Sequence, residues 1–420
     1  MSLRVLLVTE AYEGLGHVAP WHRLLETLHE HGHGHAVAMA CPQASLARPL
    51  LEDTGARVLQ AWWPSMHSSA IDEPSYCWED LLWNLGYGSN RAVAACAKYW
   101  GKLLASEKPD VIVADYAPLA MSIAKSLDIP VIEAGGGFCV PPVLAGQPMW
   151  LPHIHQLNLR MERSQEWTAR AEHRGSSIAQ AFNRSLPVTN CLPEFDAIYQ
   201  SASVRCVTSS PELDHYASWR ANDVEYLGAL ALASLEADPD VSASQWASAS
   251  DTGMKLLCYL KDSTPRLDEL LAQLAASVDW QILIAGLSGS QVAQLCAPNA
   301  ELPGHIYISE QALDFSRAIP LADVFLTNGG IHSLSYALSQ AKYCLLVPSQ
   351  AEQASTAFLL KDHALIGIVG EVLHLQEQLL QIENAGHQTH ADMQGGRAEL
   401  QKPNVTAEAI LLTFIEKLAC

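Results

Sequence analysis

The sequence has few positive charges and no long apolar run. Lys and Arg number 25 against 45 Asp and Glu, which gives a net charge of −20. A surface this acidic repels nucleic acid and anionic lipid, so neither is an expected partner. No stretch approaches the ~18–20 apolar residues of a membrane span, and the apolar run near the N-terminus is too short for a signal peptide. We therefore expect a cytoplasmic protein without a transmembrane segment.

Paired cysteines and phosphate-binding motifs are also missing. The ten cysteines form no C-x-x-C pair, and the closest two, Cys191 and Cys206, lie 15 positions apart. Zinc ribbons and redox motifs need tighter spacing, so we expect reduced thiols. There is no GxxxxGK[ST] sequence. The segment from His29 to His33 spells H-E-x-x-H, but Gly32 ends the helix that would place both histidines on one face, so we expect no metal site there.

What the sequence does contain is a strand–turn–helix pattern that occurs twice. Continuous apolar runs between turn signals are typical of strands buried on both faces, and such strands alternating with helices predict an α/β protein with parallel sheets. In the first half we predict strands at Arg4–Thr9, His35–Cys41, Val111–Ala114, Val131–Glu133 and, closing the sheet, Val204–Thr208, with helices at Trp21–Leu28 and Ala117–Leu127.

The second half repeats the pattern after a segment rich in Ala, Ser and Asp. We predict strands at Lys255–Leu260, Gln281–Ala285, Val324–Thr327 and Cys344–Val347, with helices at Arg266–Ala276, Ile331–Gln340 and Thr406–Leu418. The expected organisation is a first domain over residues 1–227, a linker over 228–253, a second domain over 254–403, and a terminal helix over 404–420 that packs back on the first domain.

Two polar residues follow strands of the first domain, where open α/β sheets bind ligands. His17 comes after the first strand and can act as a general base near neutral pH. Asp115 directly follows Val111–Ala114 and can orient a histidine. Each has a structural alternative, since His17 can be a packing residue and Asp115 can cap the next helix.

Two further features bear on ligands. The turn Thr327–Ser333 contains Gly329 and Gly330, so a helix N-terminus there can approach a phosphate, or the glycines can simply serve a tight turn. Five of the 11 tryptophans gather at positions 62, 63, 78, 83 and 100. Aromatic residues on irregular segments often line apolar pockets, although some of these will belong to the core.

Several segments then occur in a characteristic order. They are Gly14–Pro20, Ala114–Pro118 with Gly135–Phe138, Ala322–Gly330, and Pro348–Gln353. Their order and spacing resemble the UDP-glycosyltransferase superfamily, especially its bacterial macrolide-type and small-molecule enzymes, over essentially the whole chain. The resemblance implies the GT-B fold, two Rossmann-like doubly wound domains facing a central cleft. It also implies that His17 is the catalytic base and Asp115 its partner.

The resemblance further implies how substrates are bound. The acceptor would contact Trp62, Trp63, Trp78, Trp83 and Phe138 of the first domain. The implied partners are a nucleotide sugar and a small-molecule acceptor, without a metal or other cofactor, and a homodimer is left open. The donor would contact the second domain, with Gln311 and Leu313 at the base, Asn328, Gly329, Gly330 and Ser333 at the diphosphate, Glu352 and Gln353 at the sugar, and Lys261 nearby.

Two positions depart from the family pattern. Asn328 stands where the family usually has a histidine that contacts the diphosphate. Asparagine donates a hydrogen bond but cannot become cationic, and a charge-assisted contact is about twice as strong as a neutral one. Lys261, after the first strand of the second domain, can supply the missing cation. Tyr336 stands where plant relatives often carry a glutamate for the donor ribose.

The expected function is an inverting, metal-independent glycosyl transfer. A UDP- or dTDP-linked sugar would pass to a hydroxyl of a small, largely apolar acceptor. The alternative, prompted by Asn328, is a non-catalytic relative of the same fold that binds a nucleotide or lipid or serves as an auxiliary subunit. Retention of His17, Asp115 and the Glu352-Gln353 pair favours the enzyme. A nucleotide-sugar epimerase on this fold has no support from the aromatic segment.

Overall fold

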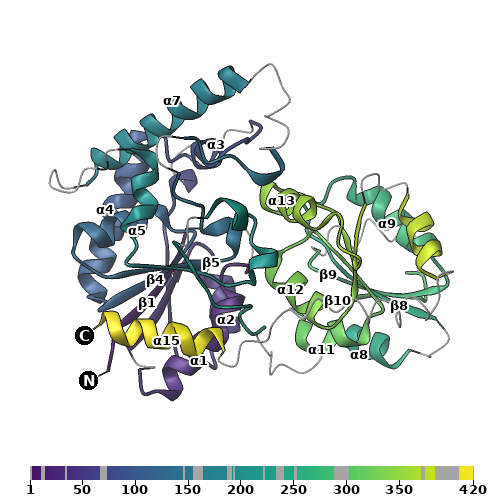
Figure 1. The fold of residues 1–420 in the computed structure, drawn as a ribbon. Helices are drawn as coiled ribbons and strands as arrows, with labels where there is room; N and C mark the ends of the chain where they lie inside the picture. The colour runs from purple at the N-terminus through teal and green to yellow at the C-terminus, as the bar shows by residue number, and fades with distance from the viewer. Residues whose placement is uncertain are drawn as a thin grey trace. The chain divides into compact units, whose positions relative to one another are not determined.

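The computed structural model describes two compact units of the chain (Figure 1). The first unit comprises Met1–Ala231 and Pro403–Cys420, and the second comprises Leu232–Lys402. The described residues are all except 1, 11–14, 34–35, 67–72, 145–146, 155–163, 187–191, 193, 221–222, 233–240, 250–252, 288–301, 310, 312, 370–373, 384–405 and 420.

A seven-stranded parallel sheet forms the centre of the first unit. Its strands run in the order β3-β2-β1-β4-β5-β6-β7, so the order reverses between β1 and β4. Every residue of β1, β2, β4 and β5 is buried, as expected for strands covered on both faces. The strands are β1 (Val5–Thr9), β2 (Val37–Cys41), β3 (Arg57–Gln60), β4 (Val111–Asp115), β5 (Val131–Gly135), β6 (Val204–Val207) and β7 (Glu225–Tyr226).

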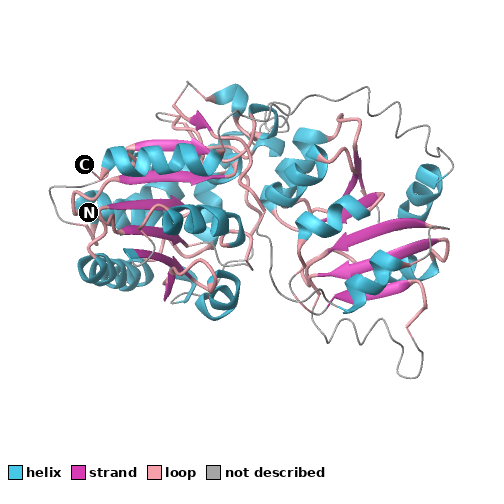
Figure 2. Ribbon diagram, turned by 90° about the horizontal axis from the view of Figure 1, so that it is seen from below, coloured by secondary structure: helices cyan, strands magenta, loops and turns pink. Residues whose placement is uncertain are grey.

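Helices cover both faces of this sheet (Figure 2). The C-terminal helix α15 belongs to the first unit and lies beside α1, where Leu411 and Ile415 join the same apolar core as Leu24 and Leu28 (Figure 1). The helices are η1 (Ala19–Trp21), α1 (His22–Glu30), α2 (Ala44–Leu51), η3 (Pro64–Met66), α3 (Trp78–Asn84), α4 (Asn90–Glu107), α5 (Pro118–Ser126), η4 (Gly137–Cys139), α7 (Ser164–Asn183), η6 (Phe195–Ser201), η7 (Pro211–Leu213), η8 (Ala217–Trp219) and α15 (Ala407–Leu418).

The second unit repeats the arrangement with six parallel strands. Their order is β10-β9-β8-β11-β12-β13, which reverses between β8 and β11. Its strands are β8 (Met254–Tyr259), β9 (Trp280–Ala285), β10 (Ile306–Ser309), β11 (Val324–Thr327), β12 (Tyr343–Leu346) and β13 (Ile366–Ile368). Its helices are α8 (Val241–Ser248), α9 (Leu267–Ala276), α11 (Phe315–Leu321), α12 (Ile331–Ser339) and α13 (Ala351–Leu360).

Two sequence expectations differ from the structure. The strand predicted at Val204–Thr208 does not close the first sheet, because the two-residue strand β7 pairs with its outer edge. The segment predicted as a linker contains helix α8, whose Trp246 is buried and donates its indole N–H to the carbonyl of Gln281 at 2.9 Å. The buried Trp246 and the bond from the Lys255 ammonium to the carbonyl of Ala247 thus help to hold this Ala- and Ser-rich segment on the second sheet.

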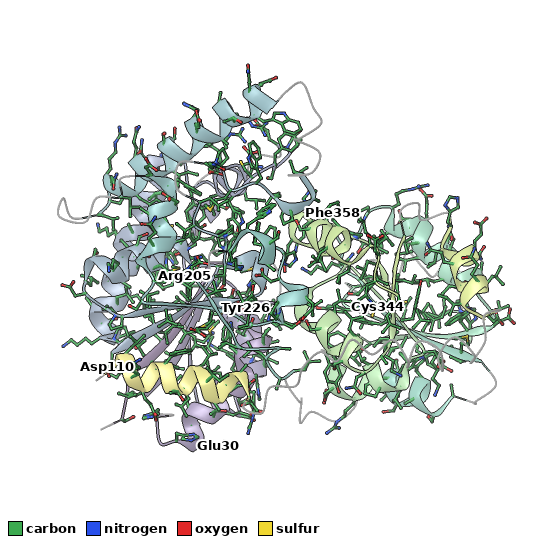
Figure 3. All side chains as sticks on the ribbon, in the orientation of Figure 1. Glu30, Asp110, Arg205, Tyr226, Cys344 and Phe358 are labelled. Carbon is green, nitrogen blue, oxygen red and sulfur yellow. The ribbon has the colours of Figure 1, made fainter. Side chains whose placement is uncertain are left out.

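Buried ion pairs connect β5 and β6 of the first sheet and the turn that follows β5. Arg205 of β6, labelled in Figure 3, lies opposite Glu133 of β5 in the strand register. Its Nε atom donates to the Glu133 carboxylate at 2.6 Å. The Arg220 guanidinium pairs with Asp214 and also donates to the carbonyl of Gly137 at 3.0 Å. Because buried charges require such partners, these contacts hold β5 and the following η4 turn in one position.

Among the residues that the structure describes, no helix is long and apolar enough to cross a membrane.

Candidate active site

His17 and Asp115 meet at the point where the strand order of the first sheet reverses. Asp115 is the last residue of β4 and lies opposite Thr9, the last residue of β1. The turn after β1 brings the Nδ1 atom of His17 to 3.0 Å from the Oδ2 atom of Asp115. The Asp115 side chain is 3% exposed and the His17 side chain is 22% exposed. The pair is therefore anchored at its carboxylate and accessible at its imidazole.

The Asp115 carboxylate is held by more than the histidine. The indole N–H of Trp21 donates to the same Oδ2 atom at 3.3 Å. A Cβ on Gly135 would lie 2.6 Å from the Oδ1 atom of Asp115, so only glycine fits at that position of β5. These contacts fix the carboxylate, which in turn fixes the imidazole and favours the tautomer with the proton on Nδ1.

The helix-capping alternative for Asp115 is wrong. Helix α5 begins at Pro118, and its N-cap residue is Ala117, which has no side-chain oxygen to accept from the helix. The first N–H groups of α5 are satisfied by Glu10 instead, whose carboxylate accepts from Leu119 N at 3.3 Å and from Ala120 N at 2.8 Å. A carboxylate at a helix N-terminus is favourable, and here it comes from the residue after β1.

Glu10 was not found by sequence analysis. It is 2% exposed, and Tyr87 donates its hydroxyl to the Oε2 atom at 2.5 Å. Burial raises the pKa of the Glu10 carboxyl to about 7, against the opposing effect of these hydrogen bonds. An acidic residue directly after a buried strand was the available signal, but the sequence did not reveal which N–H groups it would meet.

The aromatic residues predicted to bind an acceptor divide into two groups. Trp78 and Phe138 are buried and their ring centroids lie 5.3 Å apart. Trp78 also contacts the ring of Tyr116, which lies 6.0 Å from the His17 ring, and donates its indole N–H to the hydroxyl of Tyr216 at 2.7 Å. These side chains form a packed cluster beside His17, consistent with a structural role.

Trp62 and Trp83 remain partly exposed, whereas Trp63 is 8% exposed. The Trp62 ring is stacked on Tyr99 with centroids 4.7 Å apart, and the Trp83 ring lies 5.6 Å from the Arg174 guanidinium carbon. The tryptophan-rich segment is therefore mostly occupied by contacts within the first unit, with Trp62 and Trp83 retaining accessible surface.

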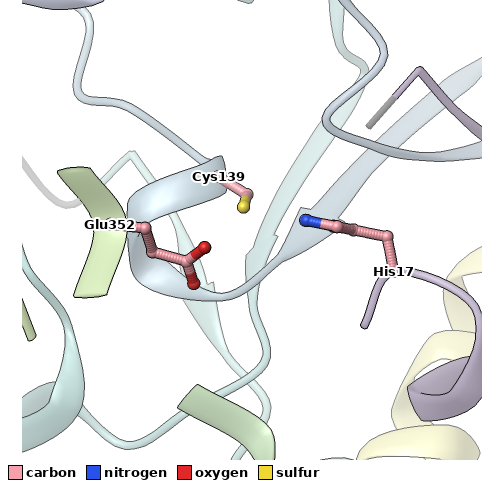
Figure 4. A group of neighbouring side chains, drawn as sticks. All are labelled: His17, Cys139 and Glu352. Atoms are coloured by element: carbon pink, nitrogen blue, oxygen red, sulfur yellow. The ribbon is translucent and has the colours of Figure 1, made fainter. Parts of the chain in front are cut away.

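Cys139 adds a group that the sequence analysis did not assign. It ends the η4 turn after β5 and is 5% exposed. A ring nitrogen of His17 and the Sγ atom of Cys139 lie within 4.8 Å of each other, and Figure 4 shows the two side chains pointing toward one another. The Cys139 thiol therefore borders the imidazole, and its place depends on the Gly137 contact with Arg220.

In the second unit, Asn328 occupies the corresponding position after β11, and its side-chain amide is hydrogen-bonded within the protein. Its side chain is buried, with the residue 3% exposed. Its Oδ1 atom accepts from Lys261 N at 2.9 Å, and its Nδ2 atom donates to Thr264 Oγ1 at 3.0 Å and to the carbonyl of Val347 at 2.8 Å. The amide therefore ties together the segments that follow β8, β11 and β12, and contact of Asn328 with a diphosphate stays a prediction.

The two glycines after Asn328 open the N-terminus of α12. Gly329 has a φ of +96°, which a side chain would strain. Gly330 is the N-cap residue and carries no side chain that could accept from the helix N–H groups. Ser333, in the first turn, directs its hydroxyl to the carbonyl of Gly330 at 3.2 Å. This nine-residue helix thus presents its positive end without a capping side chain.

The other residues predicted to bind the donor differ in their exposure and in the hydrogen bonds that their side chains make within the protein. Gln353 is 2% exposed, and its Oε1 atom accepts from both the N and Oγ atoms of Ser349 at 2.8 Å. Glu352 is partly exposed in the first turn of α13, and Lys261 and Leu313 are also partly exposed. Gln311 is exposed and lies between two residues outside the described part of the chain.

Other histidine clusters are engaged in internal contacts. His33, the last residue of the H-E-x-x-H sequence, is buried and accepts from Leu3 N through Nδ1 at 3.1 Å. His22, Glu26 and Asp53 lie close enough to share a metal ion. However, the Nε2 atom of His22 already lies 2.9 Å from the Asp53 carboxylate, so this cluster is satisfied as a hydrogen-bonded pair.

Comparison with known proteins places this geometry in a fold class. No family model matches the sequence, and no curated protein is similar to it in sequence. The chain is similar in structure to the glycosyltransferase SnogD from Streptomyces nogalater, with a TM-score of 0.67, 18% identity and 100% of each chain covered. It is also similar to the calicheamicin glycosyltransferase CalG4, with a TM-score of 0.63, 16% identity, and 100% of this chain and 98% of that chain covered.

A third similar structure is the spinosyn rhamnosyltransferase SpnG in complex with thymidine diphosphate. The TM-score is 0.64 at 14% identity, with 98% of this chain and 100% of that chain covered. SpnG has also been solved in complex with the spinosyn aglycone. At these identities the likeness establishes the fold. The chain has the two-domain α/β architecture of these enzymes, the GT-B fold, which the sequence resemblance predicted.

We predict that stability falls with rising pH because Glu10 is buried. A carboxyl whose pKa is raised in the folded state stabilises the protein fully below its unfolded pKa, and this contribution is lost as the pH rises through about 7. A shift from 4.5 to about 7 corresponds to roughly 3 kcal/mol. Urea unfolding at pH 5 and pH 8 should show this loss, and Glu10→Gln should reduce it. An equal loss in Glu10→Gln and in the exposed control Glu30→Gln would contradict the assignment.

We also predict that Asn328 stabilises the second unit. In Asn328→Ala, the Lys261 N–H and the Val347 carbonyl lose their partner, and an unsatisfied buried group costs about 1–3 kcal/mol. The free energy of unfolding of the second unit should therefore fall by at least about 2 kcal/mol, measured by urea denaturation. The control Ser339→Ala, on the exposed end of α12, should change it little. Equal stability of the two variants would show that the amide is dispensable.

Proposed function

We propose that the protein is an inverting glycosyltransferase that moves a sugar from a nucleoside diphosphate to a hydroxyl of a small, largely apolar acceptor. The observation that carries this proposal is the hydrogen-bonded pair of His17 and Asp115 at the strand-order reversal of the first sheet. Its support is the GT-B fold shared with solved glycosyltransferases. The open N-terminus of α12 in the second unit adds a site suited to a diphosphate.

The dyad has the chemistry needed to activate a hydroxyl. With the Nδ1 proton directed to Asp115, the Nε2 atom of His17 keeps a lone pair that can accept the acceptor's hydroxyl proton. The hydroxyl oxygen forms a bond to the anomeric carbon while the bond from that carbon to the diphosphate breaks, and the electron pair leaves with the diphosphate. Attack opposite the leaving group inverts the configuration. Asp115 stabilises the imidazolium that results.

The diphosphate would bind at Gly329, Gly330 and Ser333. The α12 N-terminus offers backbone N–H groups and a positive dipole end, which stabilise the charge that develops on the leaving group. This supplies the stabilisation that a metal ion would otherwise give, so we propose a metal-independent reaction. Lys261, whose backbone is held by Asn328, is the nearby cationic candidate. Asn328 contributes by shaping this loop.

The donor's sugar and base would use more accessible side chains. Glu352 is partly exposed and suited to sugar hydroxyls, whereas the buried amide oxygen of Gln353 is bonded to Ser349. The segment with Gln311 and Leu313 would contact the base. SpnG was solved with thymidine diphosphate, which makes dTDP-linked as well as UDP-linked sugars reasonable donors.

The acceptor would lie against the first unit near His17. Trp62 and Trp83 are partly exposed and would contact the acceptor, and the buried Trp63, Trp78 and Phe138 would contribute to the apolar surroundings. An apolar body with a hydroxyl fits such a surface. SpnG was solved with its aglycone, which is consistent with an acceptor of this kind.

The donor half can be tested by calorimetric titration of the purified protein with UDP, dTDP and their sugar conjugates. Micromolar binding of one nucleotide sugar would support the proposal and identify the donor for an acceptor screen. A control variant, Ser339→Ala, keeps the α12 N-terminus unchanged and should bind equally. Absence of binding at millimolar nucleotide would contradict the transferase and favour the non-catalytic alternative.

We predict that His17→Ala lowers kcat by about 10²–10⁴-fold, the usual contribution of a general base, and leaves donor affinity unchanged. Asp115→Asn should also lower kcat, because an amide cannot stabilise the imidazolium. The measurement is release of nucleoside diphosphate that depends on the acceptor. His31→Ala, which removes an exposed histidine of the same unit, is the matched control. Full activity in His17→Ala would overturn the assignment of the base.

A further inference from the structure

A cavity of about 400 Å³ lies in the first unit, apart from the candidate catalytic pair. One wall is a face of α7 that includes Gly175 and Ser176, and the opposite wall comes from Met149 and Phe195. Glu79 of α3 also lines it. The volume is within the range of small-molecule binding sites, which is about 300–1,000 Å³.

The charged residues that line this cavity are all acidic. Glu79 and Asp196 are buried, with 5% and 8% of each residue exposed, and Glu172 and Glu194 are exposed lining residues. Within the described part of the chain, no ion pair joins any of these four carboxylates to a lysine or arginine. The nearby arginines of α7 are committed elsewhere, since Arg170 and Arg174 both bind Asp80.

Glu79 differs from the other buried acids of this unit. Its two carboxylate oxygens lie 3.3 Å from the single backbone N–H of Met149, and the carboxylate also accepts from the Cys77 thiol and from its own backbone N–H. Glu133, by comparison, pairs with the Arg205 guanidinium. Among the described residues no lysine or arginine pairs with Glu79, and a buried carboxylate is costly unless a cation joins it.

The rest of the lining is apolar or uncharged. Leu144, Met149 and Phe195 supply side chains for an apolar body, and Gly175 keeps α7 close, since a Cβ there would lie 3.2 Å from Glu79 Cγ. A lining that combines apolar side chains with acidic ones and no cation is the chemical complement of an apolar molecule that carries a positive charge.

We propose that this cavity binds a small apolar molecule bearing a protonated amine, with the amine paired to Glu79. The ammonium group would donate to the Glu79 carboxylate in a charge-assisted hydrogen bond, which is about twice as strong as a neutral one. Phe195 and Met149 would cover the apolar part. The proposal does not depend on the proposed transferase activity, because none of the residues that carry it belongs to the dyad or to the α12 site.

The ionisation of Glu79 gives the proposal a second signature. Burial raises the pKa of this carboxyl to about 7, so part of the population is protonated near neutral pH. The groups around it are Cys77 and Asp80 on its own segment, Glu172 on α7, and Glu194 and Asp196 at η6. An ammonium ion would favour the ionised carboxylate, so binding at pH 6.5 should release a proton.

The cavity shares no lining residue with the candidate catalytic pair. His17 and Asp115 do not line it, and neither does Trp78, which precedes Glu79 in α3. A ligand bound to Glu79 would therefore contact residues other than the His17–Asp115 pair.

The test is calorimetric titration of the full chain with 4-phenylbutylamine and with its neutral analogue 4-phenylbutan-1-ol. We expect the amine to bind at least about tenfold more tightly, the ratio that corresponds to about 1.4 kcal/mol. At pH 6.5, titrations in two buffers of different ionisation enthalpy should reveal proton release with the amine and none with the alcohol. Equal affinities for the two probes, or no detectable amine binding at millimolar concentration, would overturn the proposal.

Variants locate the site. Glu79→Gln should lower amine affinity about tenfold, abolish the proton release and leave alcohol affinity unchanged, whereas Glu212→Gln, an exposed acid outside the cavity, should change neither. Ser176→Leu fills the cavity from an exposed position of α7 and should weaken both probes without unfolding the protein. Unchanged amine binding in Glu79→Gln, or unchanged binding of both probes in Ser176→Leu, would show that the probe binds elsewhere.

Discussion

The parallel pairing of β1 with β4 is the constraint on which the candidate active site depends. Thr9 lies opposite Asp115, so both strands end at the same edge of the sheet. Because the strand order reverses there, the segments that follow β1 and β4 diverge and leave space between them. The turn after β1 can then bring His17 onto Asp115, while Glu10 reaches the start of α5. The register of β1 against β4 thus positions both His17, the proposed base, and helix α5, which follows Asp115.

The strand order of the second sheet also reverses, between β8 and β11, but the side chain at that point is an asparagine that is hydrogen-bonded within the protein. Tyr259 lies opposite Thr327, and Asn328 bridges the gap by accepting from the backbone of Lys261. A histidine at this position could present a cationic ring to a ligand, whereas the asparagine amide is consumed by hydrogen bonds within the protein. The asparagine thus connects the segment after β8 to the segment after β11. Any anion bound at this edge must depend more on the backbone of α12.

The central strands could be predicted because burial on both faces leaves a continuous apolar run. Val324–Thr327 was predicted at the bounds that the structure shows, and the strand ending at Thr9 was misplaced by one residue at its start. The edges could not be predicted in this way. The edge strand β7 has two residues, one of them exposed, so neither its length nor its composition separates it from a loop.

The residues of the candidate site likewise differ in whether the sequence alone could reveal them. His17 and Asp115 could be identified because each follows a recognisable strand, and the resemblance assigned both together. The fate of Asn328 could not be deduced, since its partners include Val347, 19 positions away, and only the folded sheet brings the two together. Cys139 and Glu10 were missed for the same reason. Their importance comes from neighbours contributed by other strands, and no local pattern records those neighbours.

The excess of acidic residues has a consequence inside the first unit as well as on its surface. Glu10, Glu79 and Glu133 are all buried, and burial raises the pKa of each carboxyl. Two of them have strong partners, a helix N-terminus for Glu10 and the Arg205 guanidinium for Glu133. These contacts hold α5 and β5, which flank the dyad, so their carboxylates serve the framework. Glu79 accepts from the Met149 backbone and the Cys77 thiol, has no lysine or arginine partner among the described residues and borders a cavity, which is why we propose it as the partner of a cationic ligand.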